Sequence, residues 1–246
     1  MGKKKLRLDL LLVKRGLMPD SKQAERLIRA GRISVDGCPA DKPGRPVPID
    51  ADIILKETSR YVSRGGEKLS GALEYFRLDL AEKTAMDVGS STGGFTDCLL
   101  QAGVRKVYCI DVGKGQLAWK IRQDPRVDAA EGVNARYLTP DSIPELVDII
   151  TIDVSFISLT KVLPSCIKLL KPGGYVLALI KPQFEAGRNE VERGGVVRDS
   201  RIHERVIAEI INFSSTRGLS VLGVEKSVLT GPAGNKEYFI LLHREF

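Results

Sequence analysis

The sequence lacks an apolar stretch long enough to cross a bilayer, which takes about 20 residues. Its first residues are basic, but Arg7, Asp9 and Lys14 interrupt the apolar positions that follow, so a signal-peptide core is missing. The four cysteines are scattered, with no Cys-x-x-Cys pair and no zinc-ligand spacing. These absences argue against a membrane-spanning, exported or zinc-binding protein. They predict a cytoplasmic protein with reduced thiols and no bound metal.

The surplus of positive charge lies entirely in the first quarter of the chain. Residues 1–64 contain 15 Lys and Arg against 8 Asp and Glu, and the rest of the chain contains 23 of each. Such asymmetry predicts one segment that meets a polyanion and another with a different task. A merely solvated basic face is the alternative.

The first quarter has the pattern of two short helices followed by short strands. Apolar spacing predicts a helix over 6–16, and Asp20 or Ser21 begins a second helix that ends at Gly31. Strands are expected at 33–35, 47–49 and 52–56, and the pair Asp36-Gly37 indicates a hairpin turn.

Basic residues form a stripe on the second helix. Lys22, Arg26 and Arg29 recur at helical spacing and share one face, and Arg32 continues the stripe into the next turn. Because this segment has few aromatic residues, we expect recognition of RNA shape and backbone rather than base stacking. The residues predicted to bind RNA are Arg7, Lys22, Arg26, Arg29, Arg32 and Arg64.

At this point the segment resembles a known module. Arg7-Leu8-Asp9, with Ser21, Arg26, Ile28-Arg29, Gly31, Ile33, Val35 and Gly37 at their spacing, is similar to the S-four (αL) RNA-binding domain. The resemblance covers roughly 6–56 and departs where Asp36 replaces the Asn often found before the turn glycine. It implies that this segment binds RNA.

From about residue 84, short apolar strands alternate with amphipathic helices, and the chain ends in a hairpin-like strand pair. This alternation predicts an α/β fold with a Rossmann-like, mostly parallel sheet covered by helices on both faces. The expected strands are 85–88, 106–110, 127–131, 148–153, 175–180, 221–227 and 238–243, and the expected helices are 95–102, 115–123, 159–170 and 201–217. The domain organisation predicted is a small α+β RNA-binding domain over 1–58, a linker over 59–66 and the α/β domain over 67–246.

A glycine-rich loop follows the first of these strands and reads Asp87-Val-Gly89-Ser90-Ser91-Thr92-Gly93-Gly94-Phe95. It has no Lys for a P-loop, and its Gly-x-x-x-Gly-Gly spacing differs from the dinucleotide pattern Gly-x-Gly-x-x-Gly. An acid two positions before the first glycine instead resembles the loop with which methyltransferases hold S-adenosylmethionine. We expect that carboxylate to face the amino-acid end of the cofactor.

The next two strands add polar residues at the same edge of the sheet. Asp111 can accept from both ribose hydroxyls of a nucleoside, and Asn134 can read its adenine. Each is weak evidence alone, but together they favour S-adenosylmethionine as the cofactor. The predicted contact residues are Asp87, Gly89, Ser90, Ser91, Thr92, Gly93, Gly94, Phe95, Asp111, Asn134 and Asp153.

Two motifs that are missing after the fourth strand narrow the choice of methyl acceptor. Exocyclic-amine methyltransferases carry Asp/Asn-Pro-Pro-aromatic there, whereas this chain reads Asp153-Val-Ser-Phe156, and no cysteine nucleophile for carbon-5 methylation lies nearby. No histidine base is evident, because His203 is expected on a helix surface and His243 at a strand end. The ribose hydroxyl is therefore the favoured acceptor.

Four charged residues mark strand and helix ends: Lys68, Asp153, Lys181 and Glu237. Their order resembles that of the Lys-Asp-Lys-Glu ribose 2′-O-methyltransferases related to FtsJ. A ribose hydroxyl is a poor acid, so we expect Lys181 to activate it while the other three residues position Lys181. Two ordinary surface salt bridges are the alternative.

Motifs along nearly the whole chain resemble the TlyA family, often named hemolysin A. They are Ser63-Arg-Gly-Gly-Glu-Lys-Leu69, Asp87–Phe95, Asp153-Val-Ser-Phe-Ile-Ser-Leu159, Lys181-Pro-Gln-Phe-Glu185 and Gly194-Gly-Val-Val-Arg-Asp199. The resemblance implies cytidine 2′-O-methylation of ribosomal RNA within ribosomal subunits. The compact ends of the chain favour large-subunit RNA as the target.

Residues 185–199, rich in Gly, Glu and Arg, are predicted to form a flap over the active site. Because Lys68 follows the predicted linker closely, docking on RNA is expected to affect a catalytic residue. Two rivals stay open: a membrane-active hemolysin, as the family name suggests, and a non-catalytic RNA-binding factor for ribosome assembly.

Overall fold

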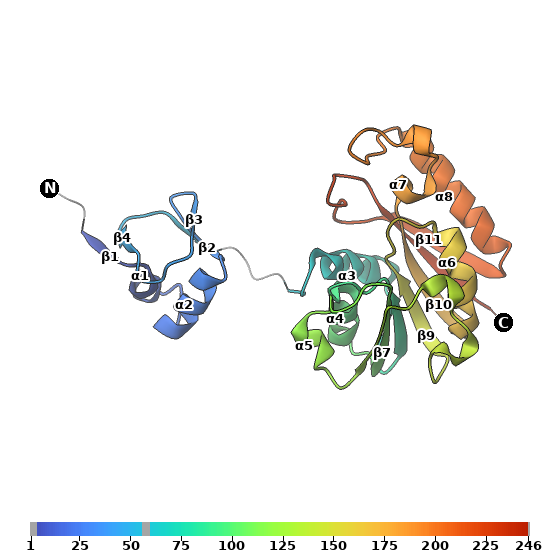
Figure 1. Cartoon of the computed structure of the whole chain (residues 1–246), viewed down its shortest axis with the longest axis horizontal. Coiled ribbons are helices and arrows are strands. Elements are labelled where there is room, and N and C mark those ends of the chain that lie inside the picture. The colour runs from blue at the N-terminus through green and yellow to red at the C-terminus, as the bar shows by residue number, and fades with distance from the viewer. Residues whose placement is uncertain (1–3, 56–59, 246) are drawn as a thin grey trace. The chain divides into compact units, whose positions relative to one another are not determined.

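The computed structural model describes residues 4–55 and 60–245, which divide into two compact units between positions 59 and 60 (Figure 1). Each unit has a core of its own and is described by itself. The predicted domain end at 58 and the linker start at 59 lie outside the described residues, as does Lys56 at the end of a predicted strand.

The first unit is a small α+β fold. Its core is formed by fully buried apolar residues of both helices and the central strand, among them Leu8, Leu12, Ile28 and Ile33. Strand β1 pairs antiparallel with β4, and β2 lies between β3 and β5 in a second antiparallel sheet. The elements are β1 (Lys5–Arg7), α1 (Leu8–Lys14), α2 (Ser21–Arg29), β2 (Ile33–Val35), β3 (Cys38–Ala40), β4 (Pro46–Pro48) and β5 (Ile53–Leu55).

Local signals explain most of these boundaries. The Asp20 carboxylate accepts from the Gln23 N–H at 2.8 Å and caps α2. Asp36 and Gly37 both have positive φ, 50° and 77°, as a tight hairpin turn requires. The predicted helix over 6–16 began too early, because its first residues pair with β4 as strand β1. Strand β3 was missed because Cys38-Pro39-Ala40 carries no alternating pattern.

The second unit is built on a seven-stranded sheet within residues 60–245, and this confirms the predicted Rossmann-like α/β class. Only β12 runs antiparallel to the other strands. In sheet order the strands are β11 (Leu219–Lys226), β12 (Tyr238–Arg244), β10 (Leu170–Ile180), β9 (Val147–Ile152), β6 (Thr84–Val88), β7 (Lys106–Asp111) and β8 (Val127–Glu131). The chain runs from β6 outward to β8 and returns to β9 on the other side of β6. The switch point of the sheet therefore lies between β6 and β9.

Helices cover both faces of this sheet (Figure 1). One apolar cluster joins α6 and α8 to the sheet, and another joins α3 and α4 to the opposite face. The helices are α3 (Arg64–Phe76), α4 (Gly94–Gln101), α5 (Trp119–Arg122), α6 (Leu159–Cys166), α7 (Pro182–Glu185) and α8 (Ser200–Ser215), with 3₁₀ turns at Ala135–Tyr137, Pro140–Ser142, Ile167–Leu169 and Arg188–Glu190.

The predicted linker over 59–66 extends too far into the second unit. Residues 64–66 form the first turn of α3, and Tyr61 is buried in the core beside them. Gly66 indicated a linker, but it is required by packing, since a β-carbon there would overlap the Tyr61 side chain. Gly66 thus marks a place where the backbone packs closely against Tyr61, and it does not mark a flexible segment.

Two further predictions are wrong. The helix expected over 115–123 is only the four-residue α5, because Gly115 takes a positive φ of 69° and the chain before Trp119 is a loop. His203 was expected on the surface of a helix, yet it is 3% exposed. It lies on the inner face of α8, where its ring finds polar partners.

Candidate active site

The glycine-rich loop lies at the switch point, between the end of β6 and the start of α4. Gly89 has a φ of 82°, and a β-carbon there would come within 2.5 Å of the backbone oxygen of Asp153. Gly93 has a φ of 89° and no room for a side chain beside Leu117 and Ile121. Only glycine at these two positions lets the loop lie against the end of β9 and the 112–118 loop.

The Asp111 carboxylate, at the end of β7, fixes this loop in place. It accepts from the Ser91 N–H at 2.7 Å and, through its other oxygen, from the Gly113 N–H at 2.7 Å. Each oxygen retains a second lone pair for a ligand hydroxyl. Asn134 lies exposed after β8, where its side-chain oxygen accepts from the Arg136 N–H.

Two cavities open at the carboxyl ends of the strands, and both are lined by Gly89, Ser91, Asp153 and Ser155. The first measures about 470 Å³ and adds Asp111, Asn134 and apolar walls from Ile110 and Val133. The second measures about 360 Å³ and is lined by polar residues; its lining includes Ser90, Thr92, Gly94, Phe95, Arg64, Lys68, Lys181 and Glu237. The predicted cofactor residues therefore divide between two adjoining cavities, except for Asp87 and Gly93, which line neither.

Asp87 does not face either cavity, contrary to the expectation from the sequence. It is fully buried, and its carboxylate accepts from the Thr96 hydroxyl at 2.6 Å and the Thr151 hydroxyl at 3.0 Å. Burial raises the pKa of Asp87 to about 6, and the two threonine hydroxyls oppose that rise. Its place between β6, α4 and β9 lets it hold these three elements together beneath the loop.

Four charged residues converge in the second cavity as two ion pairs. Lys68 from α3 pairs with Glu237, just before β12, at 2.6 Å, with 9% and 1% of their side chains exposed. Lys181, just after β10, pairs with Asp153, just after β9, also at 2.6 Å, with 11% and 22% exposed. The alternative of two surface salt bridges does not describe them, because both lysine ammonium groups are largely removed from water.

Neighbouring polar groups hold these pairs. The Lys181 ammonium donates to the Ser155 hydroxyl at 3.0 Å, and the Gln183 amide donates to Glu237 at 3.4 Å. Lys181 and Asp153 meet because β9 and β10 are parallel neighbours, so their ends lie at the same edge. A buried ion pair with added hydrogen bonds has a defined geometry, which is the condition for orienting a reacting group.

An exposed aromatic ring stands at the mouth of this site, and sequence reasoning missed its importance. Phe156 is 91% exposed and has a φ of 64°, a strained conformation for a bulky residue. Its ring centroid lies 5.0 Å from that of Phe184, and the Lys181 ammonium lies 5.9 Å from the Phe184 ring. The signal was present, since an aromatic three residues after Asp153 occupies the place of the aromatic in the amine-methyltransferase motif.

The cysteines of the second unit are unsuited to nucleophilic chemistry. Cys98, Cys109 and Cys166 are buried. Burial raises the pKa of Cys98 to about 11 and that of Cys166 to about 12, and it raises the pKa of Cys109 as well. These thiols stay protonated near neutral pH, so none is an activated nucleophile.

The predicted RNA contacts are exposed but do not form one group. Lys22, Arg26, Arg29 and Arg32 lie exposed along α2 and the turn after it. Arg7 pairs with the buried Asp9 at 2.6 Å, which holds the pKa of that carboxyl below its usual range. Arg64 belongs to the second unit, where it donates to the Thr230 carbonyl and lines the charged cavity.

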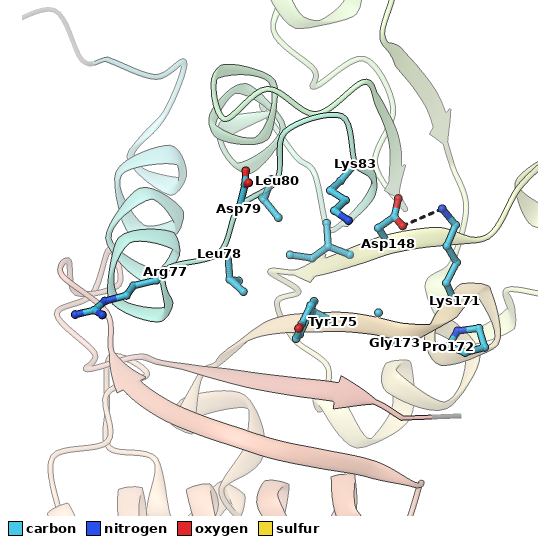
Figure 2. Close-up of a pocket in the computed structure, with 12 residues that line it drawn as sticks. Arg77, Leu78, Asp79, Leu80, Lys83, Asp148, Lys171, Pro172, Gly173 and Tyr175 are labelled. Carbon is cyan, nitrogen blue, oxygen red and sulfur yellow. Dashed lines mark hydrogen bonds and ion pairs between the residues drawn. The ribbon is translucent and has the colours of Figure 1, made fainter.

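A third cavity, of about 390 Å³, lies at the opposite edge of the sheet (Figure 2). Lys171 and Asp148 pair across it at 2.9 Å, and none of the predicted site residues lines it. Among residues 4–55 and 60–245 there is no cluster of three or more His, Cys, Asp or Glu side chains that could hold a metal. The polar groups that can orient a ligand thus meet at the carboxyl edge of the sheet.

Comparisons with known proteins agree with this geometry. The family model "FtsJ-like methyltransferase" matches residues 61–244, and the model "S4 domain" matches residues 6–53. The chain is 47% identical over 245 residues to YqxC of Bacillus subtilis, covering 99% of this chain and 87% of that protein. It is 43% identical over 244 residues to the 16S/23S rRNA (cytidine-2′-O)-methyltransferase TlyA of Mycobacterium tuberculosis, covering 98% and 91%.

A solved structure from Streptococcus thermophilus that carries a hemolysin name is also similar. It is 44% identical, superposes with a TM-score of 0.76, and covers 99% of this chain and 90% of that one. The similarity therefore spans both units of the chain.

Asp87 gives the fold a testable dependence on pH. Its folded pKa of about 6 exceeds the ordinary 3.8, so the folded protein keeps this proton where the unfolded chain loses it. The contribution of Asp87 to the free energy of unfolding is therefore greatest below about pH 4. It falls as the pH rises through about 6. An asparagine at this position does not titrate, so this fall is absent in Asp87→Asn. As the pH rises from about 4 to about 6, the free energy of unfolding of the variant therefore gains on the order of 3 kcal/mol relative to that of the parent. Urea unfolding of both proteins at several pH values measures this; a difference that is constant with pH contradicts it.

Proposed function

Because the chain belongs to the TlyA family and has its S4 and FtsJ-like methyltransferase domains, we propose that it is an S-adenosylmethionine-dependent ribosomal RNA (cytidine-2′-O)-methyltransferase. The observation that carries this proposal is the convergence of Lys68, Asp153, Lys181 and Glu237 in one cavity that adjoins a nucleoside-sized one. The substrate named for the mycobacterial relative supplies the target class.

The first cavity fits the adenosine part of S-adenosylmethionine. Asp111 offers carboxylate lone pairs to the ribose hydroxyls, and the Asn134 amide nitrogen can donate to the adenine edge. Apolar side chains such as Ile110 and Val133 can enclose the base. Gly89 and Ser91, shared by both cavities, would lie beside the end of the cofactor that reaches the charged residues.

The second cavity supports attack by a ribose hydroxyl. The cofactor supplies an activated methyl group on a sulfonium, and the 2′-oxygen must approach that carbon in line and lose its proton. We assign Lys181 to activate this hydroxyl, as the sequence predicts; Asp153 and Ser155 hold the Lys181 nitrogen in place. The Lys68–Glu237 pair faces the same space and positions the acceptor ribose.

Phe156 is proposed as the platform for the target base. A strained backbone persists where surrounding structure holds it, and here it presents an exposed ring against Phe184, the aromatic ring that lies next to the Lys181 ammonium. Stacking of a base on an aromatic ring contributes about 1–3 kcal/mol and needs no hydrogen bonds to the base. Packed against Phe184 in a tilted arrangement, Phe156 offers a cytosine such a surface next to the acceptor site.

The first unit is proposed to hold the RNA. The exposed row Lys22, Arg26, Arg29 and Arg32 suits phosphates at the spacing of a folded RNA surface, and Arg7 and Arg64 would add contacts. A division into a first domain over 1–58 and a second domain that includes α3 from its first turn accompanies this proposal, which puts the protein in the cytoplasm, where it meets ribosomal subunits. The family models, at 6–53 and 61–244, support a division of this kind.

The two rival functions have less support. A membrane-active function would explain the hemolysin name of some relatives, but it would explain neither ion pair. Within residues 4–55 and 60–245, no helix is long and apolar enough to cross a bilayer. A non-catalytic assembly factor does not require two lysine–carboxylate pairs, one buried and one half-buried, beside a nucleoside-sized cavity. Dye release from liposomes tests the first rival, and cofactor binding by calorimetry tests the second.

Methyl transfer into ribosomal subunits is the decisive experiment. We expect the purified chain to transfer tritiated methyl from S-adenosylmethionine to rRNA, with nuclease mapping giving a 2′-O-methylcytidine. In Lys181→Ala the rate should fall by about 10²–10⁴-fold with cofactor affinity unchanged, because proton transfer is lost while the first cavity is intact. Lys171→Ala is the matched control, since Lys171 lies in β10 and pairs with Asp148 at the opposite edge. A wild-type rate in Lys181→Ala would remove Lys181 from the mechanism.

Phe156→Ala should lower kcat/KM for rRNA by about 5- to 150-fold, because one base would no longer stack on an aromatic ring. Phe156→Trp should keep most of the activity, because the larger ring retains the stacking surface. Steady-state kinetics with subunit substrates measure both. Equal activity of the Ala and Trp variants would show that the ring does not support the base.

The exposed row of basic residues in the first unit predicts how the affinity for rRNA depends on salt concentration. In Arg26→Ala/Arg29→Ala, rRNA binding should weaken, and the slope of log K against log salt should shrink by about 2, one for each phosphate that an arginine no longer neutralises. The kcat at saturating rRNA should be unchanged. Lys106→Ala, at the amino end of β7, is the control and should keep the parental slope. An unaltered slope in the double variant would place the RNA elsewhere.

A further inference from the structure

Residues 185–199, the predicted flap, are hydrogen-bonded to the loop that leads into β12. In Figure 1 the orange loop between α7 and α8 lies beside the red-brown loop that precedes β12. Asn235, 3% exposed, joins the two: its side-chain oxygen accepts from the Val197 N–H at 3.0 Å, and its amide donates to the Gly195 carbonyl at 2.8 Å. Both flap residues belong to the motif Gly194–Asp199, to which the proposed reaction assigns no task.

A second connection runs through His203. Its Nε2 lies 2.8 Å from the Val197 carbonyl, and because a carbonyl only accepts, Nε2 carries the hydrogen. Its Nδ1 lies 3.0 Å from the Tyr238 hydroxyl, which in the neutral ring must donate to it. His203 is 3% exposed, so these two bonds fix both its tautomer and its orientation. Val197, itself 2% exposed, is thereby held on its N–H side by Asn235 and on its carbonyl side by His203.

These connections end on both sides of Glu237. Asn235 lies two residues before it and Tyr238 directly after it, and Glu237 makes the 2.6 Å pair with Lys68. The turn around Asn235 also limits the place of Glu237, because a β-carbon on Gly231 would come within 2.5 Å of the Glu237 carboxylate. That turn is closed by the Gly231 N–H, which donates to the Asn235 carbonyl at 2.9 Å.

We propose that Asn235 and His203 are positioning residues, through which the seated flap 185–199 fixes Glu237 and, with it, Lys68. This inference rests on the proposed function, since it assigns a task to residues around the same site. An apolar contact would hold the flap with less specificity. The Asn235 and His203 side chains instead form hydrogen bonds with particular backbone N–H and carbonyl groups of the flap. Displacing the flap would therefore break bonds that hold Asn235, two residues before Glu237, and would free His203, which holds Tyr238 directly after it.

The test compares single and paired variants of the full chain in the subunit methylation assay. His203→Ala and Asn235→Ala should each lower kcat by about tenfold or more, because small displacements of a positioned group are costly to the rate. The affinity for S-adenosylmethionine should stay within about twofold, since Asp111 and Asn134 are untouched. The double variant should lose little more than either single variant, because both act through the same flap.

A conservative variant separates positioning from mere folding. His203→Gln should recover most of the kcat, because a glutamine amide can donate to Val197 and accept from Tyr238. Tyr238→Phe removes only a hydroxyl and should lower kcat while the melting temperature stays above the assay temperature. His243→Ala is the control: this histidine lies at the far end of β12, packs on Tyr175, and should have the parental kcat.

The outcomes separate this inference from the function on which it rests. If the parent chain methylates no rRNA, the proposed function fails. If the parent is active and His203→Ala and Asn235→Ala match its kcat, only the positioning role fails. Independent, multiplicative losses in the double variant would also overturn it, as would a Gln variant no better than Ala with both proteins folded. If His203→Ala does not fold, Tyr238→Phe decides, and a parental kcat there overturns the proposal.

Discussion

The backbone oxygen of Asp153 lies so close to Gly89 that no side chain fits between them. This contact joins the loop after β6 to the end of β9, the two strands on either side of the switch point. Because the connections that follow these two strands run in opposite directions, polar groups from both can face the same space. Both carboxyl-edge cavities are lined by Gly89 and Asp153, so a ligand held by the loop is brought to the carboxylate that orients Lys181.

The charged residues come from elements far apart in the chain, and each is delivered by backbone geometry. Asp153 and Lys181 meet because β9 and β10 are parallel neighbours, whereas Glu237 arrives from an antiparallel strand and Lys68 from a helix. Burial makes these pairs costly to separate, since either charge alone would lack a partner in a poorly solvated place. Such pairs contribute little net stability, so their value lies in fixed geometry.

The sequence predicted the fold class and most strands of the second unit, because a buried parallel sheet produces unmistakable short apolar runs. It also singled out four charged residues that the structure brings into one cavity: Asp153, Lys181 and Glu237 from the ends of strands, and Lys68 from the resemblance to the Lys-Asp-Lys-Glu enzymes. The predictions failed where the role of a residue depends on its contacts. Gly66 was predicted to lie in a linker but makes room for Tyr61, and His203 was predicted to lie on the surface but is buried. Asp87 matched a motif, yet its carboxylate is turned inward to two threonines that lie 9 and 64 residues away. Phe156 had a signal in the sequence, its place three residues after Asp153, but its exposed and strained conformation is visible only in the structure.

The place of β12 in the sheet has a consequence for biosynthesis. This strand lies between β10 and β11, although both precede it in the chain. While the ribosome is still making the protein, β11 has no neighbour to pair with, and the edge of β10 is open. Glu237 enters the site only when β12 inserts, so Lys68 has no carboxylate partner until then. A nascent chain can thus form its nucleoside cavity early, yet its charged site is completed only by β12, which is translated after the other strands of this sheet.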